Sequence, residues 1–237
     1  MKARDVSKAL KALGSPEKAR GAARFFKTGP GEYGEGDTFL GVSVPEQRKV
    51  ARQFAQLPLT EVTKLLRSTL HEDRLTALII LVNQFTKAKR DPQTQADIYA
   101  LYTSHLSHIN NWDLVDSSAG PIVGGYLMNR DRSPLYRWVK SKILWERRVA
   151  MVCTQTFIKA GQHEDAFKLA EALLSDEHDL MHKATGWMLR EVGKHISPEL
   201  LRGFLKKHAH QLPRTALRYA IEHFDITERK RWLAAKG

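Results

Sequence analysis

The sequence has almost no cysteine and no long hydrophobic run, and each shortage excludes a class of protein. Cys153 is the only cysteine in 237 residues, which rules out a disulfide framework and any cysteine-rich zinc or iron–sulfur site. The longest aliphatic stretch, residues 77–82, is far shorter than the roughly 20 residues of a membrane-spanning helix. Met1 leads into polar helical sequence and not into the apolar core of a signal peptide. We therefore expect a soluble, cytoplasmic protein without membrane contact.

Negative charge is also scarce relative to positive charge. Lys and Arg together number 38 and Asp and Glu 26, so the formal net charge is +12. Residues 1–30 hold 8 basic and 2 acidic residues, and residues 183–237 hold 12 and 5, so the surplus lies at the two ends. This distribution favours a polyanionic partner, with nucleic acid as the leading candidate. A solvated basic surface is the alternative.

Strand patterns are absent, and helical periodicity runs through most of the chain. Apolar residues follow the three-and-four spacing of an amphipathic helix, for example at Leu75, Leu78, Ile79, Val82 and Phe85. Prolines stand where helices should begin, as in the Ser-Pro-Glu triplets at residues 15–17 and 197–199. We expect about fourteen helices and an all-α fold.

The spacing of the longer helices indicates a repeat. They are predicted to start near His71, Asn111, Ile143, His178 and Pro213, at intervals of about 40, 32, 35 and 35 residues. Shorter helices are predicted between them, over residues 60–66, 134–139, 165–174 and 198–208. This alternation predicts an α-solenoid of HEAT-like helical pairs that forms one domain over residues 1–237.

Four cations share a position in these longer helices. Arg74, Arg148, Lys183 and Arg214 each fall in the first turn or two. If the long helices line a concave face, their N-termini and these cations form a curved, basic row of phosphate sites.

Residues 28–43 form the one long segment that does not look helical. Its five glycines permit a close backbone approach, but Glu32, Glu35 and Asp37 would repel a phosphate, and no nucleotide-loop spacing is present. We interpret this glycine-rich loop, which follows the first helical pair, as an ordered connection that positions that pair.

One acidic residue near the middle of the chain has no evident local role. Asn110 or Asn111 can cap the helix that follows, and with Asn110 as the cap Asp113 occupies the third helical position. Asp116 lies one turn further on and shares a helix face with Trp112, four residues before it. Asp116 is either a functional carboxylate or an aspartate bonded to a neighbouring helix.

Two further positions have both a structural and a functional explanation. Arg148 begins a long helix and could form an ion pair between repeats. Trp187 could be a core residue, and the adjacent Gly186 costs roughly 1 kcal/mol within a helix, which suggests that another element approaches closely there.

No pattern of residues predicts a metal site or an activated nucleophile. His178 and His182 have i,i+4 spacing, but the glutamate of the zinc-protease motif is missing. Cys153 has no activating neighbour and no serine elbow is present. We expect neither a metal nor another cofactor.

Three separated blocks give the chain a family resemblance. They are Trp-Asp-Leu-Val-Asp at residues 112–116, Trp-Glu-Arg-Arg at 145–148 and Lys-Ala-Thr-Gly-Trp-Met-Leu-Arg-Glu at 183–191. In this order they resemble the AlkD-type DNA alkylation repair family of HEAT-like DNA glycosylases. The glycine-rich loop is also similar to members with a longer first loop, so the resemblance spans nearly the whole chain.

This resemblance implies a monofunctional DNA glycosylase that removes N3- and N7-alkylated purines from double-stranded DNA in base excision repair. By motif match, Asp116 would be the catalytic carboxylate and Trp112 the aromatic residue beside it. Arg148 would be the active-site arginine and Trp187 the second aromatic residue of the cleft. A monomer is expected, associated with the nucleoid when bound to DNA.

The predicted DNA contacts combine the resemblance with the basic pattern. They are Phe25, Arg74, Lys183, Arg190, Arg214 and Arg218. Where relatives place a tyrosine, this chain has Phe25 and Phe26, so a hydroxyl contact is lost.

A non-catalytic helical-repeat module that binds nucleic acid or protein is the alternative function. Asp116 discriminates between the two, because a groove that only binds phosphates has no use for an anion at its centre.

Overall fold

The computed structural model describes residues 1–234, and in this part of the chain all regular secondary structure is helical, without a β-strand. Thr38 and Leu70 form an isolated bridge. The prediction of an all-α fold is therefore confirmed, and short helices such as the three-residue α8 (Gly125–Leu127) bring the number of α-helical segments slightly above the expected fourteen. Within residues 1–234, no helix is both long and apolar enough to cross a membrane.

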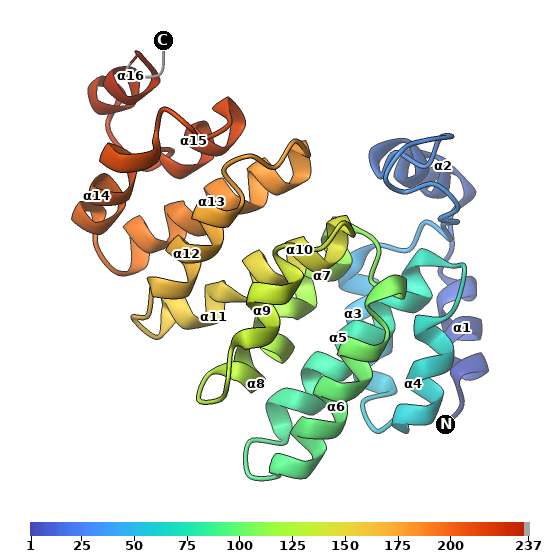
Figure 1. Ribbon diagram of the computed structural model, residues 1–237. Coiled ribbons are helices and arrows are strands. Elements are labelled where there is room, and N and C mark those ends of the chain that lie inside the picture. The colour runs from blue at the N-terminus through green and yellow to red at the C-terminus, as the bar shows by residue number, and fades with distance from the viewer. Residues whose placement is uncertain (235–237) are drawn as a thin grey trace. The chain divides into compact units, whose positions relative to one another are not determined.

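The chain divides into two compact units, Met1–Ile122 and Val123–Gly237. Figure 1 colours unit 1 from blue to green and unit 2 from green to red. The helices of unit 1 are α1 (Ala3–Ala12), α2 (Pro16–Phe25), α3 (Val44–Gln53), α4 (Leu59–Leu66), α5 (His71–Lys87), α6 (Pro92–Ser104) and α7 (Trp112–Ala119), with a 3-10 turn at Leu106–His108. A π-helical turn, Gly120–Gly124, follows α7.

Unit 2 contains the remaining helices. After α8 they are α9 (Ser133–Trp138), α10 (Leu144–Val152), α11 (Thr154–Lys159), α12 (Glu164–Ala172), α13 (Asp179–His195), α14 (Pro198–His208), α15 (Arg214–Ala220) and α16 (Ile226–Ala234). The predicted solenoid with its concave basic face, and the single domain over residues 1–237, stay predictions.

Unit 1 is built around α5. This helix packs against α3, α4 and α7, and every residue from 71 to 81 is buried. Helices α2 and α3 begin at the local signals that the sequence carries: Ser15 caps α2, and Ser43 and Glu46 form a capping box on α3. The apolar residues that follow in α5 form the core of this unit.

Unit 2 is built around α13, which packs against α10, α14 and α15. Gly186 lies where α15 comes closest, since a Cβ atom added there would stand 2.3 Å from the carbonyl oxygen of Ala216. Gly124 has a similar role, because its added Cβ would stand 2.4 Å from the carbonyl oxygen of Cys153. The close approach predicted at Gly186 is therefore confirmed.

The predicted starts of the long helices agree with the structure, but the predicted lengths hold only for α5 and α13, with 17 residues each. Helices α7, α10 and α15 have 8, 9 and 7 residues, fewer than the 11 of α14, which was predicted to be a short helix. His71 is the first residue of α5, and Asn111, Ile143, His178 and Pro213 are the N-caps of α7, α10, α13 and α15. Of the two predicted candidates for the cap of α7, Asn110 and Asn111, the structure has Asn111. Asp113 consequently occupies the second helical position.

Candidate active site

Helix α7 presents Trp112 and Asp116 on one face of unit 1. The helix begins at Trp112 because the side-chain oxygen of Asn111 accepts the Trp112 backbone N–H at 2.8 Å. Leu114, Val115 and Ser118 are buried, whereas Trp112 and Asp116 are half-buried. The spacing of four residues keeps the indole and the carboxylate on the side of the helix that is still partly accessible.

Trp112 belongs to a cluster of aromatic rings that we call the aromatic shelf: Phe25, Phe26, Phe39 and Trp112. Phe26 stacks on Trp112 with ring centroids 5.3 Å apart, and Phe25 meets Trp112 edge-on at 5.8 Å. Phe26 also stacks on Phe39 at 5.2 Å. Phe25, a predicted DNA contact, is 65% exposed, so its ring is available to a ligand.

The glycine-rich loop brings Phe39 to this cluster because α5 holds the loop by its backbone. The Glu72 carboxylate accepts the N–H groups of Leu40 at 2.9 Å, Gly41 at 2.8 Å and Val42 at 3.3 Å. Gly41 adopts φ +77°, and a Cβ there would stand 2.2 Å from the carbonyl oxygen of Ser15. Only glycine fits this crossing of the loop over the start of α2.

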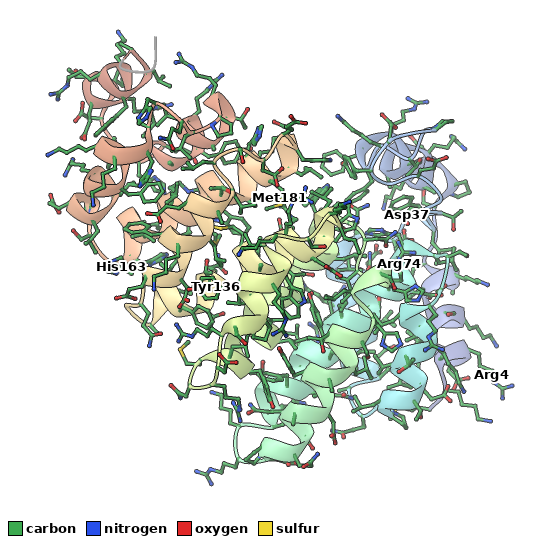
Figure 2. All side chains as sticks on the ribbon, in the orientation of Figure 1. Arg4, Asp37, Arg74, Tyr136, His163 and Met181 are labelled. Atoms are coloured by element: carbon green, nitrogen blue, oxygen red, sulfur yellow. The ribbon has the colours of Figure 1, made fainter. Side chains whose placement is uncertain are left out.

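A buried ionic network lies beneath the aromatic shelf. Asp37 pairs with Arg74 at 2.6 Å and with His71 Nδ1 at 3.1 Å, and Asn111 donates to it at 3.3 Å. The other ring nitrogen of His71, Nε2, lies 2.7 Å from Asp113. Figure 2 labels Asp37 and Arg74, which lie together in unit 1. The network thus connects the loop, α5 and the first turn of α7.

The network shifts the acidity of its members. Burial alone would raise the pKa of Asp37, but the bonds and charges of His71 and Arg74 lower it below its usual value. Burial alone would lower the pKa of His71, but hydrogen bonds with Asp113 and Asp37 raise it to about 8. Asp37 is therefore a carboxylate at neutral pH.

The sequence predicts Arg74 to be a phosphate contact, but the structure buries this side chain. It is only 4% exposed, and its guanidinium is bonded to Asp37 and to the Ser68 carbonyl. The reason is that the whole first turn of α5 points into the unit. We do not retain Arg74 among the proposed DNA contacts.

In unit 2, Arg148 and Trp187 lie on helices that pack against each other. Arg148 belongs to α10, is 4% exposed and donates from Nη1 to the Leu180 carbonyl at 2.5 Å, in the first turn of α13. Trp187 is half-buried in the middle of α13.

The remaining predicted DNA contacts differ in their accessibility. Lys183 is 40% exposed at its side chain and forms an i,i+4 ion pair with Asp179 at 2.7 Å. Arg190 is engaged by Glu222 and Glu191. Arg214 and Arg218 are exposed. Three of these four cations therefore offer accessible charge, and Arg190 is held in an ionic cluster.

The candidate metal ligands and the single cysteine all lie within residues 1–234. No group of three or more His, Cys, Asp or Glu side chains is placed to hold a metal ion in this part of the chain. Cys153 is buried, and burial raises the pKa of its thiol well above the usual value.

Sequence reasoning did not find the roles of Asp37 and His71. A signal was present: His-Glu-Asp-Arg at residues 71–74 directly precedes a stretch of the same helix, residues 75–82, in which Thr76 is the one polar residue. Such a polar turn, once buried, requires partners from distant segments.

The model of the DNA alkylation repair enzyme family matches residues 6–224, and the chain belongs to this family.

A solved structure described as a predicted DNA alkylation repair enzyme from Enterococcus faecalis has the same fold. It superposes with a TM-score of 0.70 at 17% sequence identity, covering 90% of this chain and 98% of the other. A search of curated proteins gave no match.

Proposed function

We propose that this protein is a monofunctional DNA glycosylase that hydrolyses the N-glycosidic bond of N3- or N7-alkylated purines in duplex DNA. The observation that carries the proposal is the position of Asp116, half-buried on the accessible face of α7 one turn after Trp112. Membership of the DNA alkylation repair enzyme family supports it.

The chemistry requires little more than one carboxylate. A purine alkylated at N3 or N7 carries a positive charge and departs as a neutral base, so no general acid has to protonate it. As the C1′–N bond breaks, positive charge develops on the sugar. The Asp116 carboxylate stabilises that charge and orients the water that adds to C1′ while losing a proton. No covalent enzyme intermediate forms, and the products are the free base and an abasic site.

Aromatic rings suit a cationic substrate, because each ring face attracts positive charge by roughly 0.5–2 kcal/mol. We assign this role to Trp112 and, in unit 2, to Trp187. Arg148 takes the role of the family's active-site arginine.

Duplex DNA is proposed to bind through accessible charge and through the exposed ring of Phe25. Lys183, Arg214 and Arg218 supply cations for backbone phosphates. Binding of this kind weakens steeply as salt rises. No second subunit enters the proposed reaction.

Release of 7-methylguanine from a duplex with one such lesion tests the proposal. Asp116→Asn should lower the single-turnover rate about 100-fold or more and leave DNA affinity nearly unchanged. Asp97→Asn is the matched control, because Asp97 is an exposed aspartate of α6 bonded only to Gln93 of the same helix.

Two outcomes would contradict the proposal. Equal rates for Asp116→Asn and the parent protein would remove Asp116 from the mechanism. Salt-sensitive DNA binding without release of any alkylated base would favour the non-catalytic binding module.

A further inference from the structure

His71 lies between two carboxylates that come from different parts of unit 1. Its Nδ1 faces Asp37 of the glycine-rich loop at 3.1 Å, and its Nε2 faces Asp113 of α7 at 2.7 Å. A carboxylate accepts hydrogen bonds and cannot donate them, so both bonds form only when both ring nitrogens carry a proton. The geometry therefore selects the imidazolium form of a side chain that is 2% exposed.

The other charges around His71 are accounted for. Arg74, on the same helix, pairs with Asp37 and opposes protonation of the ring. Glu72 is engaged by the backbone of the loop. Lys18 of α2 lines the cavity of about 190 Å³ beside the ring. Arg74 and Lys18 disfavour a proton on the ring, but the carboxylates of Asp37 and Asp113 contact both ring nitrogens directly and outweigh these two cations.

The imidazole ring is also part of the stacking that supports Trp112. Its centroid lies 4.7 Å from that of Phe39 and 4.9 Å from that of Phe26. Phe26 in turn stacks on Trp112. His71 thus reaches α7 by two routes, through the carboxylate of Asp113 and through the rings beneath the indole.

We propose that His71 is a positioning residue whose imidazolium bridge between Asp37 and Asp113 fixes the first turn of α7 and the ring of Trp112. The part of this inference that concerns catalysis rests on the proposed function. Loss of the ring proton breaks one of the two bridges, because a bare ring nitrogen then faces a carboxylate. The orientation of Trp112, and with it base excision, should then depend on a proton that never contacts the substrate.

A measurement on the protein alone tests the bridge. In ¹⁵N-labelled protein, two-bond ¹H–¹⁵N spectra report whether one or both nitrogens of His71 are protonated, with His71→Gln giving the assignment. We expect a doubly protonated ring at pH 7 that titrates near pH 8, the value to which its partners raise its pKa. The indole N–H resonance of Trp112, assigned with Trp112→Phe, should shift with the same midpoint.

Asp113→Asn sharpens this measurement, because it removes one of the two negative partners and should move the His71 midpoint to lower pH. The proposal would be overturned if the His71 ring carried only one proton at pH 7, or if the Trp112 indole N–H resonance did not shift as His71 titrates.

Single-turnover excision of 7-methylguanine between pH 6 and 9, corrected for spontaneous release at each pH, tests the link to catalysis. The wild-type rate should decline at alkaline pH with the midpoint of the His71 titration. His71→Gln places an amide N–H where Nε2 stood, so it should keep the bond to Asp113. Its rate should be about tenfold lower without the alkaline decline.

His71→Asn is the matched variant, because its shorter amide replaces Nδ1 and serves Asp37 only. We expect it to be slower than His71→Gln. An alkaline decline in His71→Gln like that of the wild type would overturn the positioning role. A protein that shows the coupled titration but excises no base would support the bridge and refute the proposed function.

Discussion

Charged side chains are buried in both units, but unit 1 concentrates them at the start of α5, whereas unit 2 buries Arg148 and Glu191 on separate helices. In unit 1, four successive polar residues at the start of α5 are buried, and each has partners from other segments, such as the bonds of Ser7 and Ser68 to Asp73. In unit 2, the ion pairs between helices lie nearer the surface, as between Arg132 and Asp165, whose side chains are 19% and 14% exposed.

Two tight contacts of unit 2 are made by backbone at glycine residues. Gly186 admits the backbone of α15, and Gly124 admits the carbonyl of Cys153. The comparison indicates that unit 2 has fewer buried charged residues than unit 1 and places these two glycines where helices come close together. Unit 1 accepts the cost of buried charge where a loop has to be fixed beside Trp112.

Asp37→Asn tests whether the buried ionic network stabilises unit 1, and we expect it to have the largest effect on stability. The substitution preserves shape but leaves Arg74 buried beside a neutral partner, which should lower the free energy of unfolding by about 3–5 kcal/mol. Urea denaturation followed by circular dichroism measures it. Glu35→Gln is the control, because this exposed residue of the same loop bonds only to the nearby Gly31 N–H, which a Gln oxygen can still accept. A loss below that of a surface substitution would show that the network contributes little.

Gly186→Ala tests the close contact between α13 and α15 in unit 2. A Cβ there meets the Ala216 carbonyl and Tyr219, so α15 has to move, and we expect a loss of about 1–3 kcal/mol despite the better helix propensity of alanine. In Gly203→Ala the new Cβ meets nothing within 4 Å, so that variant should gain about 0.5–1 kcal/mol. The same denaturation experiment applies, and a stabilised Gly186→Ala would contradict the close contact.

Signals within a few residues of one another predicted most of the fold. A serine, a proline and a glutamate place the start of α14 where the sequence predicts it, and the predicted segment 198–208 matches the helix. Apolar spacing and caps likewise located the starts of the long helices. These features depend on backbone hydrogen bonding and local sterics, which a single sequence contains.

Contacts between distant segments could not be predicted in the same way. Asn110 and Asn111 are equivalent as capping residues by type, and Asn111 additionally donates to Asp37, 74 positions earlier in the chain. Arg74 has the composition of a surface cation, yet its partner lies in the glycine-rich loop. The placement of Trp112 and Asp116 on one face followed from helical spacing, whereas the catalytic roles of Asp116, Arg148 and Trp187 stay predictions.

The last prediction concerns the ion pair of Arg147 in unit 2, for which we expect a small loss of stability that depends on salt. Arg147 bonds to Asp176 at 2.7 Å and to the Ser141 carbonyl at 2.9 Å, and its side chain is 16% exposed. Arg147→Gln should lower the free energy of unfolding by about 1 kcal/mol, as for a partly solvated pair.

Because ions screen partly solvated pairs more than fully buried ones, this loss should shrink in about 0.5 M NaCl, where the Debye length is only a few ångströms. The loss in Asp37→Asn should persist at the same salt concentration, since its partners are inaccessible to ions. Paired denaturation curves at low and high salt measure both. Equal salt dependence of the two variants would contradict the difference in solvent access between the Asp37 network of unit 1 and the Arg147–Asp176 pair of unit 2.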